Sequence, residues 1–209
     1  MSKKMWSLLS MGCAMALLLV AIAQADEQKM DDAAMKDAAM KAEMAKMAEW
    51  TTPGAEHAVL KVLEGNWNVS SRFWMKPGDK EEKSTATSSF AWILNGRFLT
   101  QKYMGNWAGQ PFEGQGTVGY DKIRKEYVST WLDNMSTGMS VGKSQFDAKS
   151  KTFAETGNYS CPITGEKDKW YRSEWTIKSD NKTIYSMWTK DEKGKEYKTM
   201  ELTYERAKA

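Results

Sequence analysis

Residues 90–99 read FAWILNGRFL, in which Asn95-Gly96 separates two apolar runs. Asn and Gly tolerate the positive φ values that a tight β-turn needs, so this pattern predicts a β-hairpin. We expect its two strands at residues 84–93 and 97–104. The hairpin is the clearest example of a pattern that begins at Trp67 and continues to the end of the chain.

Short runs of Trp, Tyr, Phe, Thr, Val and Ser recur along the chain, separated by Gly, Pro, Asn and Asp. They predict about ten consecutive antiparallel strands with short turns and no intervening helix, which argues against a βαβ design. Closure removes both exposed sheet edges, so we expect an all-β, up-and-down barrel. The remaining strands are expected at residues 67–75, 112–119, 126–133, 138–146, 152–158, 169–178, 182–189 and 196–205.

Residues 1–25 have the organisation of a secretory signal peptide. Two lysines give a positive start, residues 8–23 are largely apolar, and Ala23-Gln24-Ala25 fits the small-x-small pattern that precedes cleavage. A membrane anchor is the alternative, but small and polar residues interrupt a stretch shorter than the about 20 apolar residues that a span needs. We therefore expect cleavage before Asp26, a periplasmic or secreted protein, and no stable membrane span after cleavage.

Residues 26–50 form a leader of different composition. Ala, Met, Lys, Asp and Glu dominate it, without Gly, Pro or β-branched residues, so its helix preference is high. Residues 51–54 end this helix, and Gly65 ends a second, short one. The short helix is expected to present one apolar face, made of Ala55, Val59, Val62 and Leu63. The β-barrel domain then occupies residues 51–209.

The composition limits the function. One His and two Cys leave almost no material for a metal cluster or a disulfide framework, so we expect no cofactor. The net charge of +3 divides into +2 for residues 1–25, −3 for the leader, which has four lysines and seven acids, and +4 for residues 51–209. This balance gives no electrostatic case for nucleic-acid binding. Cys161 is the one thiol outside the predicted signal, so only a disulfide between two chains stays open.

Alternation within the strands leaves the barrel interior open to two interpretations. In residues 127–134 and 170–177, large side chains occur in both alternating sets, so inside and outside are not assigned. A barrel of eight or more strands can hold a small ligand, and aromatic walls with a few polar groups suit one. The alternative is that the aromatic side chains simply fill the core.

Two short patterns resemble catalytic motifs. Residues 138–142 match G-x-S-x-G, but that nucleophile pattern needs a strand-to-helix turn and a later His. This segment lies in a strand run, and the single His57 precedes it. His57 is isolated on the short helix, so we expect it to be packed or solvated rather than a ligand.

The methionines of the leader offer another chemistry. Met40, Met44 and Met47 share one helix face, and thioether sulfur is a soft ligand that selects Cu(I). Methionine is also a good helix former and an adaptable apolar contact, so a packing stripe is the other interpretation.

Six segments between Leu60 and Arg206 form a combination of motifs. They read LKVLEGNW (60–67), LNGRFL (94–99), PFEGQG followed by GYD (111–121), WLDNMSTG (131–138), PITG (162–165) and MELTYER (200–206). Together they resemble the bacterial family catalogued as domain of unknown function 1579, many of whose members are exported. Asn95 stands where the family has Gly.

The resemblance implies a lipocalin-like (calycin-type) barrel with no established reaction, and it supplies no catalytic residues. The glycines of these segments suit turns or close approach between strands. Turn chemistry does not explain Arg97, Trp131, Asp133 and Asn134, which we select, with Arg172, as candidate ligand-binding residues or an internal polar network. No residue is predicted to be catalytic or to bind a metal.

We therefore predict an exported, non-enzymatic β-barrel that binds a small apolar or amphipathic ligand. Two alternatives stay open. One is an enzyme that uses Asp133, Glu174 and Arg97 inside the barrel, although no spacing in the sequence pairs these groups. The other is Cu(I) binding through the Met-rich leader.

Overall fold

The computed structural model describes residues 3–107 and 109–208, with side chains from Glu27 onward. The chain divides into two units, one ending at Thr51 and the other starting at Thr52. The first unit is a single α-helix, α1 (Lys3–Thr51), so the predicted helical leader is confirmed. Its side chains from residue 27 onward are exposed.

The predicted signal at residues 1–25 begins outside the described residues, and its cleavage stays a prediction. Over the part of the chain that the structure describes, no helix combines the length and the apolar character that crossing a membrane requires.

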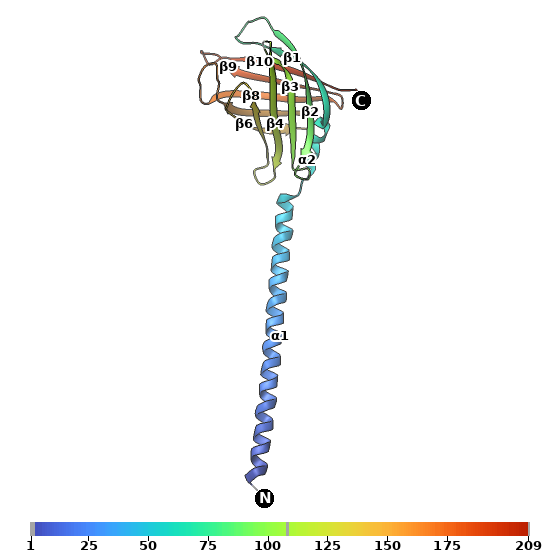
Figure 1. Ribbon diagram of the computed structural model, residues 1–209, viewed down its shortest axis with the longest axis vertical. Coiled ribbons are helices and arrows are strands. Elements are labelled where there is room, and N and C mark those ends of the chain that lie inside the picture. The colour runs from blue at the N-terminus through green and yellow to red at the C-terminus, as the bar shows by residue number, and fades with distance from the viewer. Residues whose placement is uncertain (1–2, 108, 209) are drawn as a thin grey trace. The chain divides into compact units, whose positions relative to one another are not determined.

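The second unit contains a closed barrel of ten antiparallel strands (Figure 1). Each strand pairs with its neighbours in the sequence, and β1 pairs with β10 to complete the closure. The predicted up-and-down barrel is therefore confirmed. The strands are β1 (Gly65–Phe73), β2 (Glu82–Ile93), β3 (Phe98–Trp107), β4 (Gln110–Asp121), β5 (Glu126–Asp133), β6 (Ser140–Asp147), β7 (Thr152–Tyr159), β8 (Lys169–Ser179), β9 (Lys182–Lys190) and β10 (Glu196–Arg206).

The Asn-Gly hairpin joins β2 and β3, as expected, but its turn is wider than two residues. Ile93 and Phe98 are the last register partners, so four residues form the turn. Leu94, Asn95 and Gly96 all have positive φ, at 50°, 57° and 79°. Asn and Gly adopt this region at low cost, whereas it is an uncommon conformation for a leucine.

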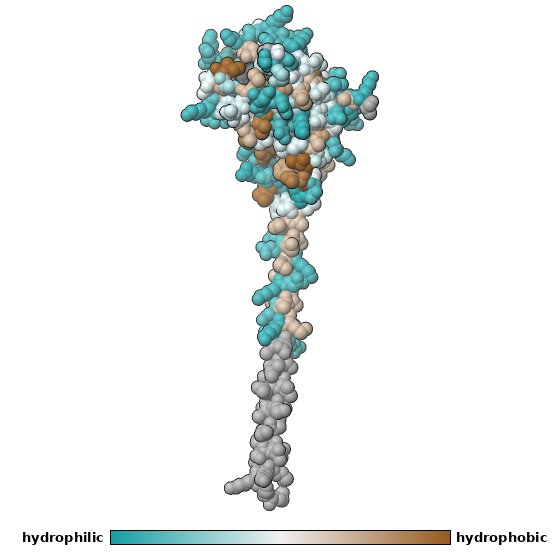
Figure 2. All heavy atoms as spheres, in the orientation of Figure 1, coloured by the Kyte–Doolittle hydropathy of each residue, from teal (hydrophilic) through white to brown (hydrophobic). Residues whose placement is uncertain are grey.

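Inward and outward positions alternate along each strand. In β1, for example, Trp67, Val69 and Ser71 are buried, whereas the residues between them are exposed. Hydrophilic residues cover most of the barrel surface that is visible in Figure 2, and the hydrophobic patches on it are small and separate. The large apolar side chains therefore concentrate inside the barrel.

One end of the barrel is closed by α2 (Ala55–Val59) and the 3₁₀ helix η1 (Leu60–Leu63). Residues three apart share a face in a 3₁₀ helix, so His57, Leu60 and Leu63 are buried together and Ala55 is exposed. The predicted apolar face was thus wrong at Ala55. Leu60 and Leu63 pack into a cluster of buried rings that includes Trp67. We call this end the base.

Candidate functional site

The barrel contains a cavity of about 1190 Å³. It extends from Leu60 and Leu63 at the base to the loops that follow β1, β3, β5, β7 and β9, which we call the mouth. Sites for small molecules usually measure about 300–1,000 Å³, so the space is ample for one. The wall carries the rings of Phe90, Tyr103, Trp131, Tyr171, Trp175 and Tyr185.

The aromatic residues divide between those that fill the base and those that line the cavity. Trp67 is 1% exposed and lies outside the cavity lining, so it fills the base. Trp131 and Tyr171 line the cavity without belonging to the filled base, whereas Trp175 lines it while packing against the base cluster. The interior is packed at one end and hollow over the rest of its length.

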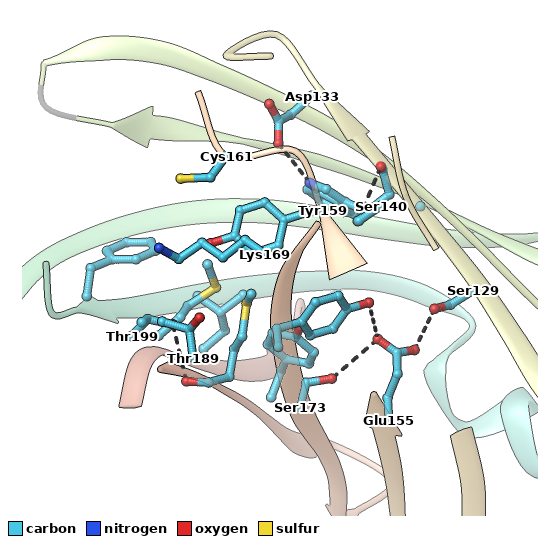
Figure 3. Close-up of a pocket in the computed structure, with 18 of the residues that line it drawn as sticks. Ser129, Asp133, Ser140, Glu155, Tyr159, Cys161, Lys169, Ser173, Thr189 and Thr199 are labelled. Carbon is cyan, nitrogen blue, oxygen red and sulfur yellow. Dashed lines mark hydrogen bonds between the residues drawn. The ribbon is translucent and has the colours of Figure 1, made fainter. Parts of the chain in front are cut away.

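Glu155 places a carboxylate midway along β7, facing the cavity (Figure 3). Tyr171 Oη donates to Glu155 Oε1 at 2.9 Å, and Ser173 Oγ donates to the same oxygen at 3.4 Å. Ser129 Oγ donates to Oε2 at 2.5 Å. Tyr171 and Ser173 come from the neighbouring strand β8, where Ser173 is the register partner of Glu155, and Ser129 comes from β5, across β6.

The phenols near Glu155 stay protonated. Burial, followed by the negative charge of Glu155, raises the pKa of Tyr171 well above its ordinary value. The same two causes, in the same order, raise the pKa of Tyr185. Both side chains therefore remain neutral hydrogen-bond donors throughout the physiological pH range, and the carboxylate lies among neutral groups.

Two glycines make room for this arrangement. A Cβ at Gly142 would lie 2.4 Å from Glu155 Cδ and 2.6 Å from Tyr171 Oη. A Cβ at Gly157 would lie 2.8 Å from the Tyr171 ring and 2.5 Å from the Val141 carbonyl oxygen. Gly142 is the last residue of the G-x-S-x-G match, so packing against Glu155 explains its presence without any nucleophile.

A second polar cluster lies at the mouth, around the free thiol of Cys161. Burial opposes ionisation, but hydrogen bonds from Thr164 and Ile163 and the charge of Lys169 outweigh it and lower the pKa of this thiol. Lys169 Nζ bonds Glu166 Oε2 at 2.7 Å, and this contact raises the pKa of Lys169. Burial, with a smaller contribution from Cys161, raises the pKa of Tyr159.

Trp131 and Asp133, two of the predicted site residues, line the cavity near the mouth. Trp131 Nε1 donates to Asp133 Oδ2 at 3.0 Å, and the Met135 backbone N–H donates to Asp133 Oδ1 at 3.0 Å. Asn134 lies beside them but outside the cavity lining. Its side chain bonds the backbone at the start of β4, accepting from Glu113 N at 3.1 Å.

The predicted role of the glycines in strand approach is confirmed beside Trp131. A Cβ at Gly114 would lie 2.2 Å from the Trp131 ring, and one at Gly116 would lie 3.2 Å from it. The PFEGQG segment therefore leaves the volume that the indole occupies.

The other two predicted site residues lie elsewhere. Arg97 is in the β2–β3 turn, where its guanidinium donates to the Leu94 carbonyl at 3.2 Å. Arg172 is outside the cavity lining, stacked 3.9 Å from the Trp188 ring centroid and bonded to Glu174 and Glu196. Ligand binding by the five selected residues stays a prediction.

The carboxylates and the arginine chosen for acid–base chemistry do not share a site. Asp133 lines the mouth, Glu174 is paired with Arg172 outside the cavity lining, and Arg97 occupies the turn described above. Among the described residues, no group of three or more His, Cys, Asp or Glu side chains is arranged to hold a metal ion.

The sequence interpretation missed Glu155 and its hydroxyl partners. Phe153, Glu155, Gly157 and Tyr159 form one alternating set in β7, so an acid between aromatic residues was a usable signal. That signal has meaning only once the inward set is known, and the sequence left the inward set unassigned.

A closed antiparallel barrel with an internal cavity defines the class of this protein: a small β-barrel of lipocalin-like design. More specifically, the chain belongs to the family described as a protein of unknown function (DUF1579), whose model matches residues 52–206. The resemblance noted in the sequence is therefore confirmed. No curated protein matches the chain significantly.

Solved structures with the same fold are distant in sequence. Rv2717c from M. tuberculosis superposes with a TM-score of 0.58 at 13% identity, covering 74% of this chain and 99% of that one. The S-type phycobiliprotein lyase CPES from Guillardia theta gives a TM-score of 0.54 at 11% identity, with 76% and 95% coverage. At these identities the likeness concerns the fold alone.

Proposed function

We propose that the protein is an exported, non-enzymatic binding protein that holds one small apolar or amphipathic molecule inside its barrel. The observation that carries this proposal is the cavity of about 1190 Å³ with an aromatic wall. Protein interiors pack about as densely as organic crystals, and unfilled volume lowers stability. A hollow of this size is thus better explained by a ligand than by the needs of the fold.

The polar groups of the cavity support an amphipathic occupant. The aromatic wall would bury the apolar part of the ligand, and a few polar groups would orient it. Glu155 with its hydroxyl partners and the Trp131–Asp133 pair are such groups. They lie at two levels of the barrel, midway along β7 and near the mouth.

Native mass spectrometry of the protein purified from its own host tests ligand binding. We expect an additional bound mass that disappears when the protein is denatured and that reappears in the organic extract. A protein that carries no ligand, and that takes up none of a panel of apolar probes, would contradict the proposal.

Export rests on the signal-like residues 1–25. We expect the mature protein to begin at Asp26 and to be recovered from the periplasm or the medium. Mass spectrometry of the intact protein from each fraction measures both. An intact chain that still begins at Met1 and is confined to the cytoplasm would contradict export without affecting the cavity.

Cu(I) binding by the leader is a second candidate, favoured by one observation. The side chains of Met40, Met44 and Met47 are 57%, 63% and 61% exposed on α1, so their sulfur atoms are accessible. Titration of Cu(I) into the 26–50 peptide and into a variant with all three methionines changed to Leu tests it. Equal, weak binding by both peptides removes this candidate.

A further inference from the structure

The carboxylate of Glu155 faces the cavity with hydroxyl groups as its hydrogen-bond partners. We propose that Glu155 binds the ammonium group of the ligand, so that the occupant of the barrel is an apolar molecule with one protonated amine. This inference rests on the proposed function, because it names the chemical class of the ligand that the cavity holds.

The first argument is the distribution of charge around the cavity. Its other charged lining residues belong to the mouth, at strand ends or in loops: Lys76, Asp133, Lys169, Lys190, Asp191, Glu192 and Lys193. Glu155 forms no ion pair with any of the described side chains. The middle of the barrel therefore carries a carboxylate without a cation of its own.

The second argument is energetic. Glu155 is half-buried, and a ligand enclosed in the cavity would remove its carboxylate from water, which is costly unless hydrogen bonds and an opposite charge compensate it. Tyr171, Ser129 and Ser173 supply hydrogen bonds but leave the net charge unchanged. A ligand cation would neutralise that charge, whereas an anionic ligand would add repulsion and a neutral one would leave the charge in place.

The third argument is geometric. An ionised carboxylate offers about four acceptor positions, and three are used by the hydroxyls, so one remains for a ligand. The hydroxyl oxygens of Ser129 and Ser173 can also accept from an ammonium group, which has up to three donors. The rings of Tyr171 and Tyr185 line the same cavity, and aromatic faces attract cations.

Isothermal titration calorimetry of the full chain at pH 7 with n-decylamine, 1-decanol and n-decanoate tests this inference. The three probes share an apolar chain, and an alkyl amine is protonated at this pH, as the lysine amine is. We expect the wild type to bind decylamine about tenfold more tightly than decanol, which corresponds to about 1.4 kcal/mol. Decanoate should bind most weakly.

Two variants locate the effect. Glu155→Gln keeps the shape and an acceptor but removes the charge, so it should bind decylamine and decanol within about twofold of each other. Glu174→Gln is the matched control, because it removes a carboxylate from the adjacent strand that pairs with Arg172 outside the cavity lining. It should keep the tenfold preference.

The outcomes separate the inference from the proposed function. Equal binding of all three probes by the wild type supports a binding barrel and overturns the amine assignment, and so does a tenfold preference that survives in Glu155→Gln. Binding of none of the probes overturns both. If circular dichroism shows that Glu155→Gln does not fold, the wild-type comparison still tests the preference for an amine, and its absence overturns the inference.

Discussion

The guanidinium carbon of Arg206 lies 4.2 Å from the ring centroid of Trp67, where the first and last strands of the barrel meet. The same side chain donates to the carbonyls of Val62 and Glu64, both at 2.8 Å, and to that of Asp180 at 2.7 Å. One side chain thus connects η1, β1, β10 and the β8–β9 turn.

Arg206→Lys should lower the free energy of unfolding by about 1–3 kcal/mol. A lysine has one nitrogen and lacks the planar fork, so it cannot serve three carbonyls in different directions. Hydrogen bonds from charged groups contribute about 1.5–3 kcal/mol each. Of the contacts of Arg206, those with Glu64 and Asp180 are exposed and the one with Val62 is partly buried, which limits the loss. Urea denaturation followed by circular dichroism measures the change.

Arg124→Lys is the control for this substitution. Arg124 is in an exposed turn, where its guanidinium lies 3.6 Å from Asp121. Such surface pairs contribute about 0–1 kcal/mol, so the control should be nearly silent. An equal loss of stability in both variants would mean that Arg206 does not stabilise the junction between β1 and β10.

Strand positions were predictable because their signals are local. The β2–β3 hairpin follows from Asn95-Gly96 and its flanking apolar runs, and each other strand lies between turn residues. The meeting of Trp67 with Arg206 was not predictable in this way. It depends on how the two ends of a ten-stranded meander return to each other, and no local pattern encodes that register.

The inward face was not predictable for a different physical reason. Trp170 in β8 and Trp188 in β9 point away from the cavity, opposite the residues that line it. Each has a cation over its ring: Lys190 Nζ lies 4.6 Å from the centroid of Trp170, and the guanidinium carbon of Arg172 lies 3.9 Å from that of Trp188. Large rings therefore occupy both faces of these strands. Because side chains alternate with period two, a wrong choice of face exchanges Arg172 for Ser173 and hides the Glu155 cluster.

Gly142→Ala should destabilise the barrel by about 1–3 kcal/mol, the usual range for an added methyl group in a filled site. The new Cβ would meet Glu155 Cδ at 2.4 Å, and three hydroxyls hold that carboxyl in place. Thermal or urea unfolding measures the loss.

Gly138→Ala, in the loop before β6, provides the comparison. Its nearest neighbours, Ser136 and Ser160, would be 3.3 Å from the added Cβ, so small shifts suffice. We expect a loss at most half that of Gly142→Ala. If the two substitutions are equivalent, the space at Gly142 is not reserved for the Glu155–Tyr171 pair.

Met187→Trp should abolish ligand uptake while leaving the barrel folded. Met187 lines the cavity and is the register partner of Ser173, so a larger ring at this position would occupy the ligand volume. Filling an existing hollow costs less than overpacking a dense core, and we expect stability within about 1 kcal/mol of the wild type. Nile red fluorescence measures uptake.

Met104→Trp is the matched control, since Met104 is 62% exposed on β3 and is not part of the cavity lining. It should bind the dye as the wild type does. Dye binding that is unchanged in both variants would place the uptake site outside the barrel interior.

His57 should make the stability of the barrel depend on pH below neutrality. The side chain is buried at the base, its ring lies 6.1 Å edge-on from Tyr120, and its Nδ1 accepts from Gly54 N at 3.1 Å. Burial lowers its pKa below the usual value of 6.5; Glu56 opposes this shift, and Lys122 and Arg97 add to it.

The sign follows from proton linkage. Well above pH 6.5 His57 is neutral in both states, and its contribution to stability is complete. As the pH falls below 6.5, the unfolded chain takes up a proton that the folded chain resists, so unfolding becomes more favourable until the pH passes the lowered pKa of the folded state.

His57→Asn keeps an acceptor near Gly54 and does not titrate. The difference in unfolding free energy between wild type and variant, measured in urea from pH 7 to pH 5, should shift steadily against the wild type. Carboxylate titration is common to both proteins and cancels in this difference, and the chain has no second histidine. A constant difference would show that His57 carries its proton equally well in both states.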